Sequence, residues 1–447
     1  MKCHEAKELF FAYVKGELDE KTGSQMQSHL DVCETCRKEV NDVSAVLALV
    51  ESASDEKVID MVNNIIYDAI NSKADLIHLE SEPDGIRVRI RRYGVLHDSA
   101  RLFPEVKEPV AARIKLMANM NVSERRIPQD GAIFSMQVPD NDQKWNIRVS
   151  CVPSVHGESF VMRLLGGSNV HLGLDKLGIA PAQLSQIHNL LQRKNGWIIT
   201  TGPSDSGKTT MLYSMLVHMN SDQRKLITLE DPVEYYLRGV TQIQVHKAVG
   251  LTFAAGLRVT LRNDPDIVMT GETPDLETAE IATKLAITGH TILSVLHTND
   301  APSALIRLVD MGLEPFVVTS AVNGVLSQRL VRKVCDDCRE EYTPEPDVLE
   351  ALGFTLQDVA GTKFYRGKGC DKCSNTGYVG RTLLLEVMMM NQELAKLIVS
   401  RAPLAEIRDC AIANGMIPMA ADARQKIKDG IITAEEAARV LEIDPIS

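Results

Sequence analysis

Aromatic residues are scarce in this chain. They make up 4% of its 447 residues, and two of them are tryptophan. Basic residues are in the minority, because 60 Asp and Glu residues outnumber 49 Lys and Arg residues and leave a net charge of −11. Proteins that travel along nucleic acid combine basic grooves with aromatic side chains on which bases stack. The composition therefore disfavours a nucleic-acid translocase, and no nucleic-acid partner is expected.

Long apolar runs are missing as well. A helix that crosses a membrane needs about 20 consecutive apolar residues, and no segment of this sequence approaches that length. A secretory signal is not expected either, because Cys3, His4 and Glu5 interrupt any apolar segment near the N-terminus. The sequence predicts a cytoplasmic protein whose contact with a membrane is indirect, through partners.

Residues 202–210 carry the most informative pattern. They read Gly-Pro-Ser-Asp-Ser-Gly-Lys-Thr-Thr, which matches the G-x-x-x-x-G-K-[ST] phosphate loop. The apolar run 197–201 predicts a strand before the loop, and the apolar spacing from Met211 onward predicts a helix after it. Backbone N–H groups of such a loop surround a phosphate, and the helix N-terminus adds partial positive charge. Lys208 is placed to reach the terminal phosphates and Thr209 to hold Mg²⁺. The predicted nucleotide-binding residues are Gly202, Pro203, Ser204, Asp205, Ser206, Gly207, Lys208, Thr209 and Thr210.

Two carboxylates and two histidines lie next to further predicted strands. Glu230 ends one apolar run, Glu272 follows another, and His290 and His297 flank a third. In open α/β sheets the carboxyl ends of the strands line the ligand crevice. A carboxylate there can hold Mg²⁺ or orient the attacking water. Any one of these residues alone favours a surface or capping role, whereas their occurrence together after a phosphate loop favours a nucleotide-hydrolysing site.

Seven of the nine cysteines are spaced as metal ligands, whereas Cys151 and Cys410 stand alone. Two C-x-x-C pairs separated by 31 residues lie among glycine-rich turns, and a third pair lies near the N-terminus. In a reducing compartment such thiolates suit tetrahedral Zn²⁺ rather than disulfides. The alternatives are reduced thiols that bind no metal and, near the N-terminus, a small helical bundle with buried thiols. The predicted ligands are Cys335, Cys338, Cys370 and Cys373 in one site, and Cys3, His29, Cys33 and Cys36 in the other.

The fourth N-terminal ligand is open at this point. His29 and Cys33 are four residues apart, so they are predicted to share one face of a helix. Cys36 lies within reach of both. Cys3 would complete a Cys₃His site, and His4 competes with it for that position.

The pattern of apolar residues divides the chain into five parts. Short apolar runs that alternate with helical segments predict a mostly parallel sheet covered by helices in the middle of the chain. Residues 51–55 are predicted to be a linker, and 166–169 a hinge. The predicted parts are a helical zinc-finger adaptor at 1–50, a smaller α+β domain at 51–166, an α/β core at 170–330, a tetracysteine insertion at 331–385 and a helical subdomain at 386–447.

Four longer segments are more distinctive than the phosphate loop alone. Residues 250–266, which end in Leu-Arg-Asn-Asp-Pro-Asp, precede the second acidic residue. Residues 288–301 contain both histidines, 227–234 contain Glu230, and 125–131 read Arg-Arg-Ile-Pro-Gln-Asp-Gly. These segments resemble the signature, histidine box, aspartate box and smaller domain of the GspE/PulE/PilB family. Its members are cytoplasmic hexameric ATPases that drive type II secretion and type IV pilus assembly. The resemblance covers about residues 55 to 445.

The resemblance implies a RecA-like P-loop ATPase core preceded by a smaller, PAS-like α+β domain. It implies hydrolysis of ATP to ADP and phosphate by a homohexamer that acts on an inner-membrane platform protein. The ATPase itself would be cytoplasmic and peripheral at that membrane. The tetracysteine insertion resembles that of assembly and secretion ATPases, and pilus retraction ATPases lack it. The resemblance therefore favours assembly of a pilus or secretion pseudopilus over retraction.

Catalytic roles also follow from the resemblance. Glu230 and Glu272 are expected to handle water and metal, without a division of these two tasks between them. His290 and His297 are expected either to couple nucleotide state to domain movement or to serve structural hydrogen bonds. Four arginines match family residues that approach the nucleotide or the subunit interface, where a planar guanidinium suits phosphate. They are Arg148, Arg163, Arg258 and Arg262.

Three features depart from the family pattern. The first 40 residues resemble the short zinc finger of anti-sigma factors rather than the usual docking domain, which predicts a protein-binding adaptor of unknown partner. Asp205 stands where the phosphate loop usually has Gly, and its charge opposes phosphate binding. Thr273-Pro274-Asp275 replaces the usual Ile-Arg-Asp, although Pro274 suits the start of a helix. The two changes near the nucleotide predict slow hydrolysis or altered subunit coupling. The altered phosphate loop and the replaced docking domain favour an alternative in which the chain is a weakly or non-hydrolysing nucleotide-binding regulator.

Overall fold

The computed structural model describes residues 1–15, 18–53, 55–139, 141–166 and 173–442. It divides into two compact units, Met1–Gly167 and Ser168–Ser447. The predicted hinge at 166–169 falls at this boundary, and its residues from 167 onward lie outside the described part of the chain. No helix within the described ranges is both long and apolar enough to span a bilayer.

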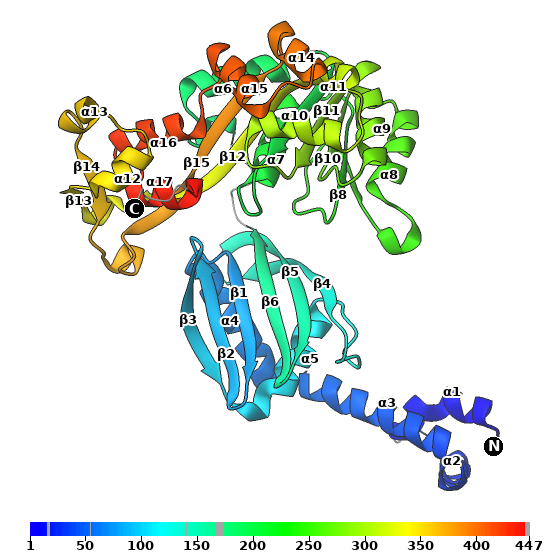
Figure 1. Ribbon diagram of the computed structural model, residues 1–447. Helices are drawn as coiled ribbons and strands as arrows, with labels where there is room; N and C mark the ends of the chain where they lie inside the picture. The colour runs from blue at the N-terminus through cyan, green and yellow to red at the C-terminus, as the bar shows by residue number, and fades with distance from the viewer. Residues whose placement is uncertain (16–17, 54, 140, 167–172, 443–447) are drawn as a thin grey trace. The chain divides into compact units, whose positions relative to one another are not determined.

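Three helices form the N-terminal part of the first unit (Figure 1). They are α1 (Cys3–Val14), α2 (Glu20–Val32) and α3 (Glu34–Ala53). Asp19 caps α2 by accepting the backbone N–H groups of Lys21 and Thr22. Helix α3 continues through the predicted linker as far as Ala53. The linker prediction was wrong over 51–53, because Glu-Ser-Ala contains no Gly or Pro that would end the helix.

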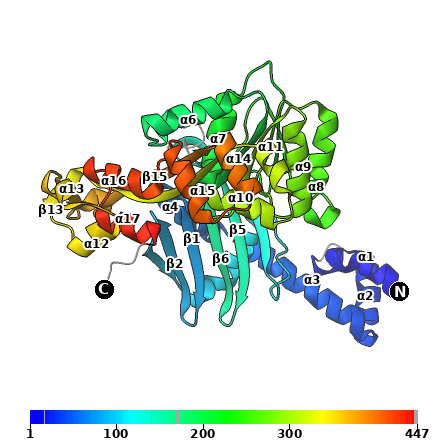
Figure 2. The ribbon, with the colours of Figure 1, turned by 45° about the horizontal axis from the view of Figure 1, so that its top comes forward.

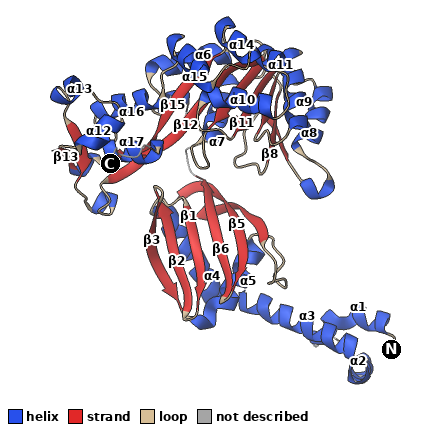
Figure 3. Cartoon of the chain, in the orientation of Figure 1, coloured by secondary structure: helices blue, strands red, loops and turns tan. Residues whose placement is uncertain are grey.

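A six-stranded antiparallel sheet forms the rest of this unit, in the order β3-β2-β1-β6-β5-β4. Helices α4 (Glu56–Asn71) and α5 (Lys107–Met117) pack against one face of it (Figure 3). The edge strand β3 was not predicted, because most of its side chains are exposed and its apolar pattern is weak. The strands are β1 (Leu76–Glu82), β2 (Gly85–Arg92), β3 (Val95–Leu102), β4 (Gln129–Val138), β5 (Asn141–Ser154) and β6 (Gly157–Gly166).

The second unit is built on a seven-stranded sheet in the order β15-β12-β7-β11-β10-β8-β9. All neighbouring strands are parallel except the β12–β15 pair. The central strands are buried on both faces, which explains their nearly continuous apolar runs. The predicted mostly parallel sheet is therefore confirmed. Its strands are β7 (Gly196–Thr201), β8 (Leu226–Glu230), β9 (Val240–Gln244), β10 (Ile267–Thr270), β11 (Thr291–Leu296), β12 (Val322–Val334) and β15 (Tyr378–Met389).

Helices cover both faces of this sheet. One layer consists of α6 and α7, whose apolar side chains share a core with one sheet face. The opposite layer consists of α8 to α11 with α14 and α15. The helices are α6 (Pro181–Leu191), α7 (Lys208–Met219), α8 (Phe253–Thr260), α9 (Leu276–Ile287), α10 (Ala301–Asp310), α11 (Pro315–Ala321), α14 (Gln392–Val399) and α15 (Leu404–Ala413).

Strands β12 and β15 extend beyond the sheet and carry the tetracysteine part at their far end (Figure 2). The predicted boundaries at 330 and 385 therefore fall inside strands. The C-terminal helices α16 and α17 share a hydrophobic core with this part, so it is not a separate insertion. Its remaining elements are β13 (Arg339–Tyr342), α12 (Pro346–Ala351), α13 (Leu356–Ala360), β14 (Phe364–Gly367), α16 (Met419–Lys428) and α17 (Ala434–Leu441).

Candidate nucleotide and metal sites

The phosphate loop connects the buried strand β7 to helix α7. Gly202 and Gly207 have φ angles of 143° and 89°, which L side chains rarely adopt. Asp205 has φ of 60° and an exposed side chain. Aspartate tolerates this left-handed conformation better than most residues do. The loop therefore keeps its backbone shape despite the missing glycine.

Lys208 opens helix α7 and folds back over the loop. Its ammonium donates hydrogen bonds to the carbonyl oxygens of Gly202 and Pro203, at 2.9 and 2.6 Å. Burial lowers the pKa of Lys208, while the negative charges of Asp205 and Glu272 act in the opposite direction. A buried cation at a helix N-terminus is the expected partner of a phosphate group.

Glu230 lies at the carboxyl end of β8, fully enclosed by neutral hydrogen-bond donors. Its carboxylate accepts bonds from the hydroxyls of Tyr213 and Thr228, and from Nε2 of Gln242 at 3.1 Å. The side chain is buried. A carboxylate whose two oxygens both accept hydrogen bonds in this way stabilises the segments that donate them. It is poorly placed to contact a water molecule.

Glu272 has the opposite environment. It follows β10, remains 43% exposed, and lies 3.4 Å from Nε2 of His297, which follows β11. Backbone bonds from Gly271 to Leu229 and from Thr273 to Val295 join these strand ends at one edge of the sheet. The parallel order of β7, β11, β10 and β8 thus brings Lys208, His297, Glu272 and Glu230 to the same edge.

His290 does not join this group. It precedes β11, at the opposite end of the strand from His297, and its Nδ1 lies 3.1 Å from the carbonyl oxygen of Leu285. The two histidines that the sequence treats alike are therefore separated by the length of a strand. Hydrogen bonding to the end of helix α9 is the role that the geometry gives His290.

The four candidate arginines lie in different units. Arg258, on α8, forms an exposed ion pair with Glu277 at the start of α9, and Arg262 lies exposed just beyond α8. In the first unit, Arg148 and Arg163 are exposed and directly opposite each other on β5 and β6. The pairing places two like charges directly opposite each other on one face of this sheet.

Pro274 does not start a helix, contrary to the expectation from its sequence position. It lies before Asp275, whose side chain accepts the backbone N–H of Thr278 at 2.8 Å and caps α9. Asp275 is the N-cap residue, has extended backbone, and is followed by the first helical residue, Leu276. Pro274 therefore lies one residue before the N-cap. The proline therefore shapes the turn between Glu272 and α9 rather than the helix itself.

Four cysteines converge between η6 (Asp336–Cys338) and η7 (Asp371–Cys373). The sulfur atoms of Cys335, Cys338, Cys370 and Cys373 lie within 4.8 Å of one another, with separations of 3.7 to 3.8 Å for three pairs. At a zinc–sulfur distance of about 2.3 Å, sulfur atoms of a tetrahedral site lie about 3.8 Å apart. Backbone N–H groups of Gly369 and Gly377 donate hydrogen bonds to the sulfur atoms of Cys338 and Cys373, as groups around metal ligands commonly do. The donor set fits Zn²⁺.

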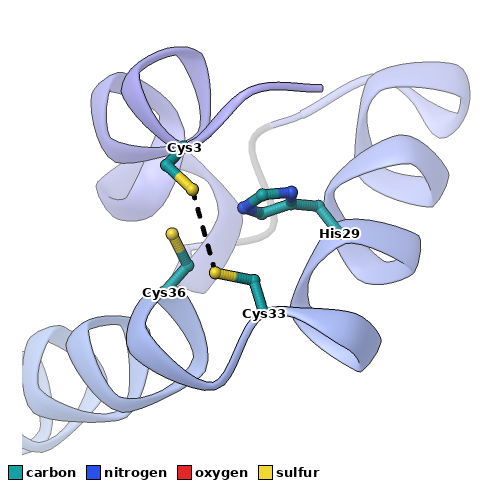
Figure 4. Close-up of side chains that lie close together, drawn as sticks. All are labelled: Cys3, His29, Cys33 and Cys36. Carbon is teal, nitrogen blue, oxygen red and sulfur yellow. Dashed lines mark hydrogen bonds between the residues drawn. The ribbon is translucent and has the colours of Figure 1, made fainter.

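The N-terminal cluster has the same compactness (Figure 4). The ligand atoms of Cys3, His29, Cys33 and Cys36 lie within 4.8 Å of one another, so Cys3 rather than His4 completes the set. Nε2 of His29 is buried and has no hydrogen-bond partner among the described residues, which suits a metal ligand. The prediction that His29 and Cys33 share one face of a helix was wrong in detail, because α2 ends at Val32 and Cys33 occupies the turn before α3.

Two residues of the nucleotide site were not singled out from the sequence. In the sequence Tyr213 looks like an ordinary apolar position of α7, although its hydroxyl donates a hydrogen bond to the carboxylate of Glu230. Gln328 lies on β12, a strand that was not predicted, and its Nε2 donates a hydrogen bond to the carbonyl oxygen of Ser206 in the phosphate loop. Residues 322–331 also contain Asn323, Ser327 and Arg329, so no signal in the sequence distinguishes Gln328 from its neighbours.

Two family profiles match the chain. The family described as "Type II/IV secretion system protein" matches residues 51–439, and the one described as "Putative zinc-finger" matches residues 3–37. Together they span both candidate metal clusters and the whole nucleotide site.

Individual relatives agree with these profiles. Type II secretion system protein E of Xanthomonas campestris pv. campestris is 41% identical over 411 residues, which cover 92% of this chain and 72% of that protein. The type IV pilus assembly ATPase PilB of Myxococcus xanthus is 40% identical over 408 residues, covering 91% and 71%. The structure of the pilus retraction motor PilT with bound ADP aligns with a TM-score of 0.60 at 25% identity, covering 86% and 97%. The ATPase DotB of Legionella pneumophila shares the fold, with a TM-score of 0.62 at 20% identity over 84% and 93%.

Proposed function

This chain belongs to the Type II/IV secretion system protein family, and from that membership we propose that it is the ATPase that powers assembly of a type IV pilus or a type II secretion pseudopilus. It hydrolyses ATP to ADP and phosphate. The observation that carries the proposal is the meeting of the phosphate loop, Glu272 and His297 at one edge of the parallel sheet.

The two carboxylates divide the work between them. Glu272 is partly exposed beside His297 and acts on Lys208 electrostatically, so it is the group that orients the attacking water. Glu230 is enclosed by three neutral donors and acts as a positioning residue for the turn after β8. This division follows from burial, since a carboxylate without access to water cannot orient it.

The residues present also fit the ions that such chemistry uses. Thr209, in the first turn of α7, would hold Mg²⁺ with its hydroxyl, and the ion would neutralise phosphate charge. Zn²⁺ in either cysteine cluster would be structural, because all four positions of each are filled by protein ligands.

Assembly and location follow the family. We propose a cytoplasmic homohexamer that acts on an inner-membrane platform protein and touches the membrane only through partners. Arg148, Arg163, Arg258 and Arg262 would meet nucleotide phosphates or a neighbouring subunit, because exposed guanidinium groups bind phosphate bidentately. The N-terminal zinc finger would recruit a protein partner of its own, since among its described residues the four ligands are the one group of His, Cys, Asp and Glu side chains that could hold a metal ion.

A second function is favoured by two specific residues. Asp205 adds a negative charge to the phosphate loop, and Pro274 replaces an arginine of the family pattern next to Glu272. Both changes lower the capacity of the site to neutralise phosphate. A weakly hydrolysing or non-hydrolysing regulator of the same machine would have these features.

ATP turnover separates the two functions. Full-length, zinc-loaded protein is assayed for phosphate release beside Lys208→Ala and Glu272→Gln. Turnover that both substitutions abolish supports the motor. Turnover no higher than that of the Lys208→Ala protein, with ATP still bound by the unaltered chain, would leave the regulator as the function.

A further inference from the structure

Gln328 lies directly beneath the phosphate loop, on a strand that comes from a distant part of the sequence. Strand β12 runs parallel to β7, and Ser327 pairs with Thr201, the last residue before the loop. Gln328 is therefore the first β12 residue beyond the end of β7. It is completely buried, which is rare for a glutamine that only fills space.

The loop rests on this residue at three points. Nε2 of Gln328 donates a hydrogen bond to the carbonyl oxygen of Ser206 at 2.9 Å. A Cβ atom at Gly202 would lie 2.3 Å from the backbone carbonyl oxygen of Gln328. One at Gly207 would lie 3.2 Å from Nε2 of the same side chain. Both glycines thus provide the close approach that brings the loop onto β12.

Two polar atoms at this contact have hydrogen-bonding capacity left. The hydroxyl of Ser206 and Oε1 of Gln328 are buried, and within the described ranges neither has a partner. Buried polar atoms in proteins are nearly always paired, so unpaired ones in a loop of this kind mark a place that a ligand or a local rearrangement completes. The unpaired hydroxyl belongs to the loop that receives phosphate.

We propose that Gln328 is a positioning residue of the nucleotide site. It holds the carbonyl of Ser206 down toward β12, so that this oxygen stays away from the phosphates and the N–H groups of the loop remain directed at them. The same strand continues from Gln328 to the cysteine cluster, reaching Val334 next to Cys335. One continuous strand thus joins the residue beneath the loop to the tetracysteine part. This inference rests on the proposed function, because it assumes that the loop binds ATP.

Gln183 provides a matched control. It is also a buried glutamine whose Nε2 donates to a backbone carbonyl, that of Leu385, and whose Oε1 lacks a partner among the described residues. It lies on α6 and contacts β15, one strand farther from the loop. Gln328→Met and Gln183→Met each remove one donor, keep the side-chain length and leave one buried carbonyl unpaired.

The test measures the dissociation constant of a fluorescent ATP analogue for the full-length variants. We expect Gln328→Met to raise it about tenfold or more and Gln183→Met to change it less than twofold, although both lower the unfolding temperature. Gln328→Glu replaces the methionine variant if that protein does not fold, and the same rise is expected. Equal effects of the Gln328 and Gln183 variants would overturn the inference. Lys208→Ala tests the proposed function separately. If that variant bound the ATP analogue as tightly as the unaltered chain does, the proposed function itself would be wrong.

Discussion

The phenolic hydroxyl of Tyr213 donates a hydrogen bond to the carboxylate of Glu230, and both side chains are buried. The same hydroxyl oxygen lies 3.3 and 3.4 Å from the backbone nitrogens of Glu234 and Tyr235 and accepts their N–H groups. Burial, reinforced by the charge of Glu230, raises the pKa of Tyr213, so the hydroxyl remains a donor at any working pH. Tyr213 lies on the helix that Lys208 begins. One hydroxyl thus connects the phosphate-loop helix to the turn after β8.

Removing that hydroxyl should impair turnover more than binding. Tyr213→Phe keeps the ring and its edge contact with Tyr235, but it takes one of three donors from Glu230. A hydrogen bond to a charged group contributes about 1.5 to 3 kcal/mol. We expect kcat to fall about tenfold, with KM within about twofold of the parent value, in steady-state phosphate release.

Tyr235→Phe is the control for that experiment. The Tyr235 hydroxyl makes no hydrogen bond within the part of the chain that the structure describes, so its loss should leave kcat unchanged. Equal activity of Tyr213→Phe and the parent protein would show that the turn after β8 is held without this bond.

The two carboxylates should respond differently to amidation. Glu272→Gln removes the partly exposed group beside His297, and we expect kcat to fall about 100-fold or more while ATP binding remains. Glu230→Gln changes a buried group, so we expect a lower unfolding temperature and a smaller loss of kcat. Single-turnover assays and thermal unfolding of both variants measure this. A larger loss of kcat in Glu230→Gln would reverse the assignment.

Zinc content should be two ions per chain, one for each cluster. Cys373→Ser should reduce it to one and lower the unfolding temperature of the second unit, because structural zinc contributes folding free energy. Cys33→Ser should also leave one ion, with ATP turnover unchanged, since its cluster belongs to the N-terminal helices. Metal analysis and calorimetry of both variants provide the check. A loss of turnover in Cys33→Ser would mean that the N-terminal cluster supports the nucleotide site.

Removing the charge of Asp205 should strengthen nucleotide binding. Its carboxylate is close enough to act on Lys208, so it also opposes the phosphates. Glycine and asparagine both tolerate its φ of 60°, so neither substitution strains the loop. We expect Asp205→Asn and Asp205→Gly to lower the dissociation constant for ATP several-fold, by about the same factor.

Salt provides the control for the Asp205 variants. A charge effect at an exposed residue weakens at high ionic strength, so the difference from the parent protein should shrink as salt is added. A gain that only the glycine variant shows, independent of salt, would indicate backbone strain instead.

Short-range patterns carried most of the correct predictions. The phosphate loop, its glycines and the buried parallel strands are local in sequence, because each depends on the conformational limits or burial of neighbouring residues. The C-x-x-C spacings likewise identified six of the eight side chains that the fold brings into two clusters. Edge strand β3 was missed because its apolar pattern is weak. The helical conformation of 51–53 was missed because the sequence does not mark where α3 ends.

The sequence by itself determined the chemistry available to this protein: a phosphate loop, acidic strand ends and cysteine pairs. Tertiary structure alone decided which of these groups can act. It buried Glu230 behind Tyr213, left Glu272 open beside His297, and moved His290 to the far edge of the sheet. It also brought Gln328 beneath the phosphate loop, although Gln328 and Ser206 are 122 residues apart in the sequence. Burial and strand order depend on contacts between distant segments, and no local pattern of residues specifies them.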